Sequence, residues 1–403
     1  MPGPLDGIKV VELGIWVAAP AAAAILADWG AEVIKIEEPD SGDPLRGLGA
    51  TGLMPADLDS NPAFTLDNRG KKGMAINLRR PGGAKVMRAL ITRADVFLSN
   101  LRTSALQRLG LTYDNLQAIN HRLIYASLTG YGVEGPDRDR AAFDYAAFWA
   151  RAGIMAALGE PDQPPPAQRP GMGDHTTALA ISGAIAAALF AREKTGRGQE
   201  IRLSLLRTGI WFQGTDIQVC LQTGLFTPPT GRRNAPNPLF NQYQTKDGRW
   251  LHLIMLQPDR HWPDFCGAIG REELILDHRF ITVRERLQNA STLIAMLDSI
   301  LATKTLSEWG AIFDRHEIFW GKVQHVGDVV RDGQVRASDA FRKLTLPSGK
   351  EIEIVASPAD FGDTPADVRA PAPELGQHTE EVLLALGYTW EEIATLKDAG
   401  AIG

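Results

Sequence analysis

Asp174 is the residue whose type and setting best suit nucleophilic chemistry. It lies in the stretch "RPGMGDHTTALAISG", after two glycines and just before a long apolar run. One interpretation is a helix N-cap, because an aspartate there accepts backbone hydrogen bonds and is favoured by the helix dipole. The other is a nucleophile, because an ionised carboxylate attacks an activated acyl carbon without a general base and gives an acyl anhydride. The local sequence leaves both interpretations open.

Two residues near this stretch are further candidates for acid or base chemistry. His175 follows Asp174 directly, but adjacent side chains at a helix start point about 100° apart, so we do not expect an acid–base pair. Asp144 stands among aromatic residues in "AAFDYAAFWARAG". It is either a structural hydrogen-bond acceptor, such as a helix cap, or a carboxyl group whose pKa is perturbed by its surroundings.

Basic side chains near predicted strand ends are candidate phosphate ligands. Lys71 and Lys72 precede a predicted strand, and Arg102 and Arg108 follow another that ends at Asn100. Short basic runs are usually a solvated face. Parallel sheets, however, bind ligands at the carboxyl ends of their strands, where phosphate groups need cations. Both interpretations stay open at this point.

The composition argues against several classes of function. The 403 residues carry a formal net charge of -6, whereas a nucleic-acid-binding surface needs a concentrated basic face. The two cysteines, Cys220 and Cys266, have neither CxxC spacing nor a nearby histidine pair, so we expect no metal site and no disulfide framework. The N-terminus lacks the pattern of a signal peptide, and the apolar run over 177–191 is shorter than the ~20 residues that span a bilayer. We therefore predict a cytoplasmic protein with a buried helix at 177–191.

The elements that must position these residues alternate between strand and helix. Strands are predicted over 8–13, 31–37, 74–78, 95–100 and 123–132, with helices after Pro20 and over 82–94. This alternation predicts an α/β fold with a parallel, helix-covered sheet. The first loop lacks the GxGxxG pattern, so an NAD site is not expected. A proline-rich stretch at 227–238 begins a smaller α+β domain with a hairpin over 240–256.

The chain as a whole resembles the class III CoA-transferases, a family that also includes the α-methylacyl-CoA racemases. The resemblance covers essentially the full length and rests on seven stretches in the same order. They are "LDGIKVVELG", "ADWGAEVIKIEEPDSGDPLR", "NRGKKGMAINL", "ADVFLSN", "RLGLTYDNLQAINHRLIYASLTGYGVEGP", "GMGDHTTALAISGAIAAALFAREKTGRGQEI" and "ELGQHTEEVLLALGYTWEEIATLK".

The resemblance implies a covalent mechanism on Asp174, which falls on the aspartate of the family's G-x-G-D segment. That carboxylate attacks an acyl-CoA thioester to give an anhydride, and the CoA thiolate returns to give an aspartyl-CoA thioester. An acceptor carboxylate then takes over the CoA. The implied partners are an acyl-CoA and a free carboxylic acid, with CoA as part of the substrate and with no permanently bound cofactor, metal, nucleic acid or membrane. The candidate CoA-binding residues are Val17, Ala18, Lys71, Lys72, Asn100, Arg108 and Asp144.

The resemblance also implies an interlaced homodimer whose large Rossmann-like domain is built from both ends of the chain. We assign 1–224 to the first part of that domain and 225–330 to the small α+β domain. The segment 331–403 is then a linker and a C-terminal return to the large domain.

Departures from the family's patterns separate its subfamilies. The racemases place a histidine where Phe143 stands, and the formate and oxalate enzymes place a glutamine where Val17 stands. The small-domain segment "RRNAPNPLFNQYQ" lacks the glycine run of the latter enzymes. The segments "AAFDYAAFWARAG" and "RNAPNPLF" most resemble transferases of the cinnamoyl-CoA:phenyllactate type, which act on aryl or branched 2-hydroxy and enoyl acids. The alternatives that remain are an acyl-CoA racemase or isomerase and a non-catalytic CoA-binding protein.

Overall fold

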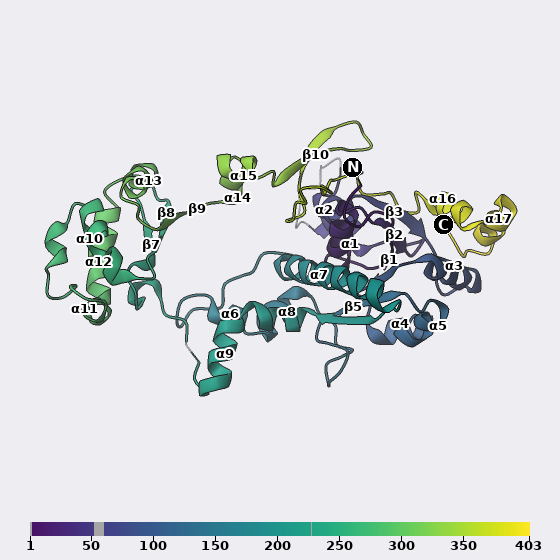
Figure 1. The fold of residues 1–403 in the computed structure, drawn as a ribbon, viewed down its shortest axis with the longest axis horizontal. Coiled ribbons are helices and arrows are strands. Elements are labelled where there is room, and N and C mark those ends of the chain that lie inside the picture. The colour runs from purple at the N-terminus through teal and green to yellow at the C-terminus, as the bar shows by residue number, and fades with distance from the viewer. Residues whose placement is uncertain (1, 52–59, 227) are drawn as a thin grey trace. The chain divides into compact units, whose positions relative to one another are not determined.

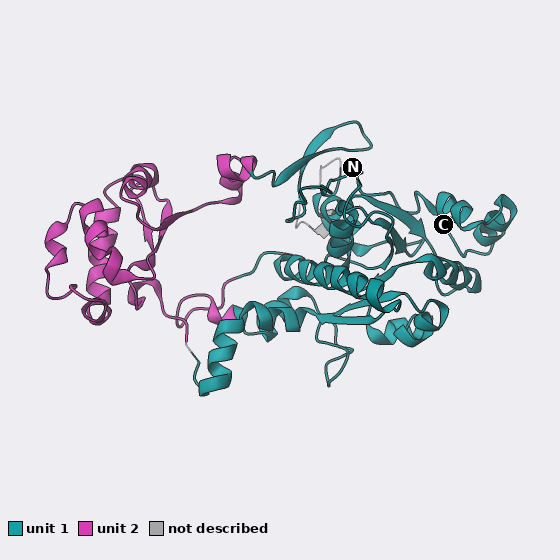
Figure 2. Ribbon diagram, viewed as in Figure 1, with its two compact units in different colours: residues 1–154, 167–226, 338–403 teal, residues 155–166, 227–337 magenta. Residues whose placement is uncertain are grey.

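A computed structural model of the chain describes residues 2–51, 60–226 and 228–403. The chain divides into two compact units (Figure 2). Unit 1 comprises residues 1–154, 167–226 and 338–403, and unit 2 comprises residues 155–166 and 227–337. Unit 2 thus extends past the end predicted for the small domain at 330, and it includes a short segment that we had assigned to the first domain.

Unit 1 is built on a six-stranded sheet in the order β3-β2-β1-β4-β5-β6 (Figure 1). Every pairing in this sheet is parallel. The strands are β1 (Lys9–Leu13), β2 (Glu32–Glu37), β3 (Lys71–Ala75), β4 (Val96–Ser99), β5 (Ile124–Thr129) and β6 (Glu200–Ser204). The predicted Rossmann-like α/β fold is confirmed. The order reverses between β1 and β4, the position at which sheets of this type open a ligand-binding crevice at their carboxyl edge.

Two strands differ from the sequence prediction. β3 begins at Lys71 and ends at Ala75, whereas we expected a strand over 74–78. Two lysines at its start obscured it, because lysine is uncommon in strands and the first of them is buried. β6 was not predicted, because "EIRLS" contains two charged residues in five.

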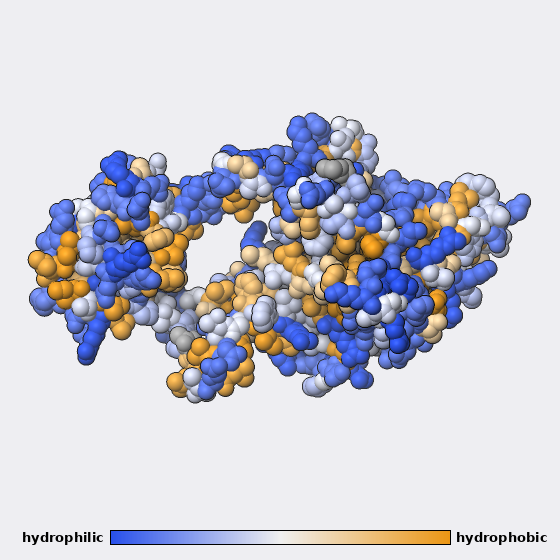
Figure 3. Space-filling view, in the orientation of Figure 1, coloured by the Kyte–Doolittle hydropathy of each residue, from blue (hydrophilic) through white to orange (hydrophobic). Residues whose placement is uncertain are grey.

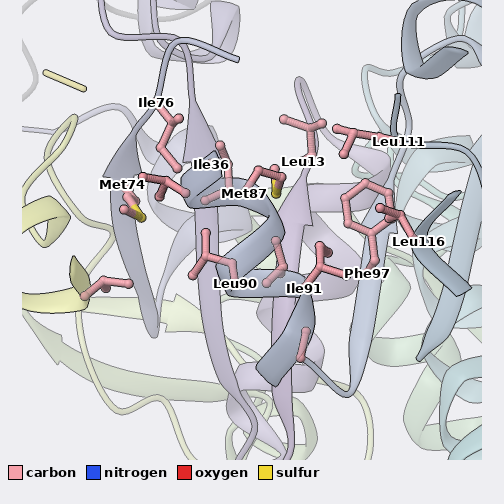
Figure 4. Close-up of a cluster of buried hydrophobic side chains, with 14 of the residues drawn as sticks. Leu13, Ile36, Met74, Ile76, Met87, Leu90, Ile91, Phe97, Leu111 and Leu116 are labelled. Atoms are coloured by element: carbon pink, nitrogen blue, oxygen red, sulfur yellow. The ribbon is translucent and has the colours of Figure 1, made fainter. Parts of the chain in front are cut away.

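Helices cover both faces of the sheet, as Figure 1 shows. On one face lie α3 (Pro81–Arg93), α4 (Thr103–Leu109), α5 (Tyr113–Ile119), α16 (Thr379–Leu386) and α17 (Trp390–Asp398). Pro81 opens α3, and Met87, Leu90 and Ile91 share its buried face (Figure 4). They pack with strand residues such as Ile36 and Phe97 in one hydrophobic core.

The other face is covered by α1 (Ala18–Asp28) and α7 (Met172–Thr195). Every residue of the alanine-rich α1 is buried. Small side chains let the two helices approach closely, and the Ser182 hydroxyl donates a hydrogen bond to the Ala22 carbonyl at 3.3 Å. By length and composition α7 alone among the described helices could cross a membrane, but Ile181, Ile185 and other residues of its inner face are buried in unit 1. The predicted helix over 177–191 is confirmed, but only its inner face is buried, and Leu179 and Phe190 are exposed.

The C-terminal segment lies against this unit. A hairpin, β10 (Phe341–Thr345) with β11 (Glu351–Val355), precedes α16. The Gly73 amide of β3 donates a hydrogen bond to the His378 imidazole, and Ile402 forms a bridge with Ile76. Shorter elements complete the unit: η1 (Pro44–Thr51), α2 (Pro62–Asn68), a π-helical segment η2 (Tyr145–Arg151), α8 (Leu205–Phe212) and α9 (Gly214–Thr223). α6 (Ile154–Ala157) stands at the boundary with unit 2.

Unit 2 is an α+β unit with an antiparallel sheet of β7 (Phe240–Gln244), β8 (Trp250–Ile254) and β9 (Trp320–Val323). The predicted hairpin over 240–256 is confirmed, and its turn places Gly248 at a φ of 73°. Its larger helices are α10 (Pro258–Ala268), α11 (Val283–Gln288), α12 (Ala290–Leu301) and α13 (Leu306–Arg315). η3 (Arg232–Asn234), η4 (Glu272–Ile275), α14 (Val326–Val329) and α15 (Gly333–Ala337) are short. Trp262, Phe265, Trp309 and Phe313 fill the core of this unit.

Candidate active site

The loop that follows β1 is held by hydrogen bonds at two consecutive residues, Ile15 and Trp16. The Asn100 side chain, just after β4, accepts a hydrogen bond from the Ile15 amide at 3.0 Å and donates one to the Ile15 carbonyl at 2.7 Å. Trp16 has a φ of 63°, a left-handed conformation that is strained for a bulky residue. Its amide donates to the Asp43 carboxylate at 2.9 Å. Asn100 and Asp43 therefore fix the course of this loop at the sheet's switch point.

A buried network of charges supports this loop from beneath. The Lys35 ammonium donates to Glu12 at 3.0 Å, to Asp43 at 2.9 Å and to the Gly14 carbonyl at 3.1 Å. Burial lowers the pKa of Lys35, but the surrounding carboxylates outweigh it and hold that pKa above its ordinary value. Lys35 is therefore charged and fully paired, and it fixes the second oxygen of the aspartate that holds Trp16.

Lys71 belongs to the same buried network. Its ammonium donates to Glu12 at 2.7 Å, to the Pro20 carbonyl at 2.9 Å and to Asn68 at 2.9 Å, so its three donors are all satisfied. Burial lowers its pKa to about 8. Lys72 forms ion pairs with Glu32 and Glu381, each at 3.0 Å, instead. In the isolated chain Lys71 is thus a buried structural cation and Lys72 is paired on the surface, and the contact of these two lysines with CoA stays a prediction.

The start of α7 is capped by a carboxylate from elsewhere in the chain. Gly171 stands at the N-cap with a φ of 75° and provides no side-chain cap. The Asp144 carboxylate, only 2% exposed, accepts a hydrogen bond from the Gly173 amide at 3.1 Å. Burial raises the pKa of Asp144, although backbone amides that donate to it oppose the rise. Asp144 therefore has the structural role that the sequence left open, and its contact with CoA stays a prediction.

Asp174 lies in the first turn of α7 and is not its cap. Among the described residues, no side chain or backbone amide is placed to donate a hydrogen bond to its carboxylate. Burial raises the pKa of Asp174 to about 7, with a further rise from the Asp144 charge. The neighbouring His175 opposes the rise. Because desolvation destabilises the ionised form, Asp174 is a more basic carboxylate than an exposed aspartate.

His175 is engaged elsewhere. Its Nε2 lies 2.9 Å from an Asp67 carboxylate oxygen on α2. Burial lowers the pKa of His175, but the hydrogen bond and the negative charge of Asp67 outweigh it and raise that pKa above its usual value. The structure thus agrees with the expectation that His175 and Asp174 do not form an acid–base pair, because the histidine is paired with Asp67 instead.

Asp174 lines a cavity of about 460 Å³ at the carboxyl edge of the sheet. Of the residues predicted for the site, Val17, Ala18, Asn100 and Arg108 line the same cavity. The sequence analysis did not select Trp16, Arg138 and Arg140 as site residues, although they line it too, together with Phe143 and Arg102. The two arginines at 138 and 140 follow the carboxyl end of β5, so the switch-point rule could have identified them.

A larger cavity, of about 850 Å³, adjoins the first one. Ile15, Leu101, Ala105 and Arg108 line both. It continues over the carboxyl ends of β1, β2 and β3 and is lined by apolar side chains such as Leu13 and Ile76 together with Arg79 and Arg108. No carboxylate among the described residues pairs with either of these guanidinium groups. The combined space can hold a long ligand with apolar and anionic parts.

Among residues 2–51, 60–226 and 228–403, no group of three or more histidine, cysteine or acidic side chains gathers as metal ligands. The two cavities present the Asp174 carboxylate of raised pKa, an aromatic surface, and the guanidinium groups of Arg79 and Arg108, with which no described carboxylate pairs.

Comparison with known proteins places this geometry in a family. The model of CoA-transferase family III matches residues 5–379. The (R)-2-hydroxy-4-methylpentanoate CoA-transferase of Clostridioides difficile is 37% identical over 398 residues, which cover 99% of both chains. The cinnamoyl-CoA:phenyllactate CoA-transferase of Clostridium sporogenes is 36% identical over 97% of this chain and 95% of its own.

A solved structure agrees with these matches. A CAIB/BAIF family protein from Brucella suis superposes with a TM-score of 0.83 at 30% identity, over 96% of this chain and 100% of that one. The family resemblance inferred from the sequence is confirmed. The chain is a CoA-transferase and belongs to CoA-transferase family III.

Proposed function

We propose that this protein moves CoA from an acyl-CoA to a free carboxylic acid through covalent intermediates on Asp174. The observation that carries the proposal is the state of that carboxylate. It lines a cavity, no described group hydrogen-bonds it, and burial raises its pKa to about 7. Near neutral pH a large fraction is ionised, and a carboxylate of raised pKa is a stronger nucleophile than an ordinary aspartate.

The proposed cycle balances without an outside energy source. The Asp174 carboxylate adds to the thioester carbonyl, and the carbon–sulfur bond breaks to leave an aspartyl anhydride and the CoA thiolate. The thiolate attacks the aspartyl carbonyl, releases the first carboxylate and leaves an aspartyl-CoA thioester. The acceptor carboxylate displaces the thiolate to form a second anhydride. The thiolate then attacks the acceptor's carbonyl, which releases the new acyl-CoA and restores Asp174.

The two adjoining cavities support a site for CoA. Val17 and Ala18 begin α1, whose N-terminal amides carry a partial positive charge toward this space. Arg108 lines both cavities and is free to pair with a phosphate. We expect Arg108→Ala to raise the KM for acyl-CoA about tenfold with little change in kcat. Arg197→Ala is the matched control, because Arg197 lies beyond the C-terminus of α7, away from these cavities.

Trapping the intermediate tests the covalent step. After incubation with an acyl-CoA donor, hydroxylamine should convert Asp174 to its hydroxamate, which mass spectrometry of the proteolytic peptide detects. Asp174→Ala should abolish both transfer and labelling while CoA still binds. Asp114→Asn, a matched acidic change in the first turn of α5, should leave both unchanged. Unlabelled Asp174 in a protein that turns over would overturn the mechanism.

Two alternatives predict different outcomes. An acyl-CoA racemase would exchange the α-proton of a 2-methylacyl-CoA with deuterium from solvent. Phe143 stands where the racemases of the resembled family have a histidine, so we expect no such exchange. A non-catalytic CoA-binding protein would bind acyl-CoA without any turnover.

The names of the two relatives guide the choice of acids. The name of the Clostridioides difficile relative contains a branched 2-hydroxy acid, and that of the Clostridium sporogenes relative contains an aryl enoyl acid and an aryl 2-hydroxy acid. We therefore propose aryl or branched apolar acids as donor and acceptor. A panel of such acyl-CoA donors against free acids, with acetate and succinate as comparisons, tests this choice.

The proposal includes a second copy of this chain. α9 has no buried residue in the isolated chain, and Figure 3 shows apolar side chains gathered over it. Trp211, Leu221, Leu225 and Phe226 are each at least 70% exposed. An apolar surface of this kind is typical of a permanent interface, which supports the predicted homodimer. Sedimentation at micromolar concentration should show a dimer.

The cytoplasmic location remains a prediction.

A further inference from the structure

An aromatic pair forms part of the wall of the cavity that Asp174 lines. Trp16 comes from the loop after β1, and Phe143 from the segment before η2. Their rings meet edge to face, with centroids 5.6 Å apart and planes at 84°. Both side chains line the 460 Å³ cavity. Any acyl group carried by Asp174 enters this space.

The Trp16 side chain is held in place at an energetic cost to the backbone. A left-handed φ of 63° is rare for a bulky residue, and such strain persists where the surroundings impose it. Here the Asp43 carboxylate accepts a hydrogen bond from the Trp16 amide. The Asn100 side chain hydrogen-bonds both the amide and the carbonyl of the preceding residue, Ile15. The backbone that carries the indole is therefore fixed before a ligand arrives, and the indole itself contacts the Phe143 ring.

Phe143 leaves much of its ring uncovered in the chain. Its side chain is 57% exposed although its ring contacts that of Trp16 edge to face. A large aromatic surface left open beside a reactive carboxylate is suited to cover an apolar ligand group. The arginines that line the same cavity suit the anionic parts of the substrates. The aromatic pair belongs to the apolar part of the wall, which also includes Leu128 and Leu205, and it supplies the ring surface there.

We propose that Trp16 and Phe143 are the specificity-determining pair of the acyl pocket. They select aryl and branched acyl groups over short ones by packing against the acyl chain next to Asp174. This inference rests on the proposed transferase function and names the residues that choose its substrate class. A pair that only supported the loop would affect all acyl groups equally.

The kinetic test compares two donors across three variants. Phe143→Ala removes one ring, Trp16→Gly removes the other while keeping a residue that accepts a positive φ, and the double variant removes both. For each single variant we expect kcat/KM for cinnamoyl-CoA to fall about tenfold and that for acetyl-CoA to change less than about threefold. The double variant should lose less than the product of the two, because the rings contact each other.

Trp390→Ala is the matched control, since this indole is 61% exposed on α17 and lies outside the cavity. It should leave both donors unchanged. Equal losses for both donors in the Trp16 and Phe143 variants would show a structural role and overturn the proposal. No loss for cinnamoyl-CoA would overturn it as well.

A binding measurement separates this proposal from the covalent mechanism. The thioether S-(3-phenylpropyl)-CoA has no carbonyl group and cannot react with Asp174. Calorimetry should show that the aromatic variants weaken its binding about tenfold and weaken that of S-ethyl-CoA far less. If Asp174 is not labelled by hydroxylamine but the aromatic variants still weaken binding selectively, the covalent mechanism is wrong and the assignment of the acyl pocket stands. If Asp174 is labelled but the aromatic variants do not weaken binding selectively, the assignment of the acyl pocket is wrong and the covalent mechanism stands.

Discussion

Replacing the proposed nucleophile should stabilise the folded protein at alkaline pH. Burial and the Asp144 charge raise the pKa of Asp174 from 3.8 to about 7. That rise corresponds to about 4 kcal/mol against the ionised form in the folded state. Because the carboxylate lines a water-accessible cavity, we discount this figure by half, to about 2 kcal/mol. Asp174→Asn keeps the shape and removes the charge.

The pH dependence gives the sign of the effect. The pKa is higher in the folded state than in the unfolded state, so the unfolded state ionises first as the pH rises. Below pH 3.8 the group costs no stability; between pH 3.8 and about 7 the wild type loses stability progressively, and above pH 7 the loss is complete. The asparagine variant escapes this loss. Its advantage should be about 2 kcal/mol at pH 8 and smaller at pH 5.

Urea unfolding at a fixed protein concentration measures this difference. The free energy of unfolding of wild type and Asp174→Asn is compared at pH 5 and pH 8, with Asp114→Asn as the control. Asp114 lies in the first turn of α5 and is exposed, so its replacement should give no pH-dependent gain. The conclusion that the Asp174 carboxylate is desolvated would be refuted if Asp174→Asn were no more stable than the wild type at pH 8. It would also be refuted if the gain in the free energy of unfolding were the same at both pH values.

Two further predictions concern the same helix start. The kcat/KM for acyl-CoA should rise with pH and level off above a midpoint near 7, the pKa of Asp174. Asp144→Asn should lower that midpoint, because it removes a charge that raises the pKa of Asp174. An unchanged midpoint in Asp144→Asn would argue against the electrostatic coupling of the two carboxylates. Gly173→Ala would bring its Cβ to 2.7 Å from the Phe148 ring, so it should cost about 1–3 kcal/mol of stability and most of the activity. Gly183→Ala, in open space on the same helix, should be neutral or stabilising in thermal unfolding, and equal effects of the two would contradict the packing argument.

Periodicity was enough to predict the sheet, because each of its first strands is short, apolar and followed by a helical pattern. β1, β2, β4 and β5 lie within one or two residues of their predicted bounds at their N-terminal ends. The start of β3 was missed because the favourable burial of Lys71 depends on Glu12 and Pro20, which lie 59 and 51 residues away, as well as on the nearby Asn68. A charge whose partners come mainly from distant segments carries little local signal.

The site was predictable in part for the same reason. Val17, Ala18, Asn100 and Arg108 stand at strand ends or loop positions, and the topology brings them to one cavity with Asp174. Trp16 could not be found from the sequence, because its importance depends on a left-handed backbone that Asp43 holds from a distant loop. Residues that act through tertiary strain become visible only when the fold is known.

The two carboxylates at the start of α7 explain how one helix end serves both stability and chemistry. A helix N-terminus favours a negative charge, and an aspartate that caps it is held by backbone amides, which lowers its pKa and its nucleophilicity. Here Asp144 accepts the Gly173 amide and takes the capping role. Asp174 is thereby left without a hydrogen-bond donor, and the Asp144 charge raises its pKa further. On the proposed mechanism, this separation of cap from nucleophile is what would let an aspartate at this position attack a thioester, and restoring the usual arrangement should stabilise the helix at the expense of the reaction.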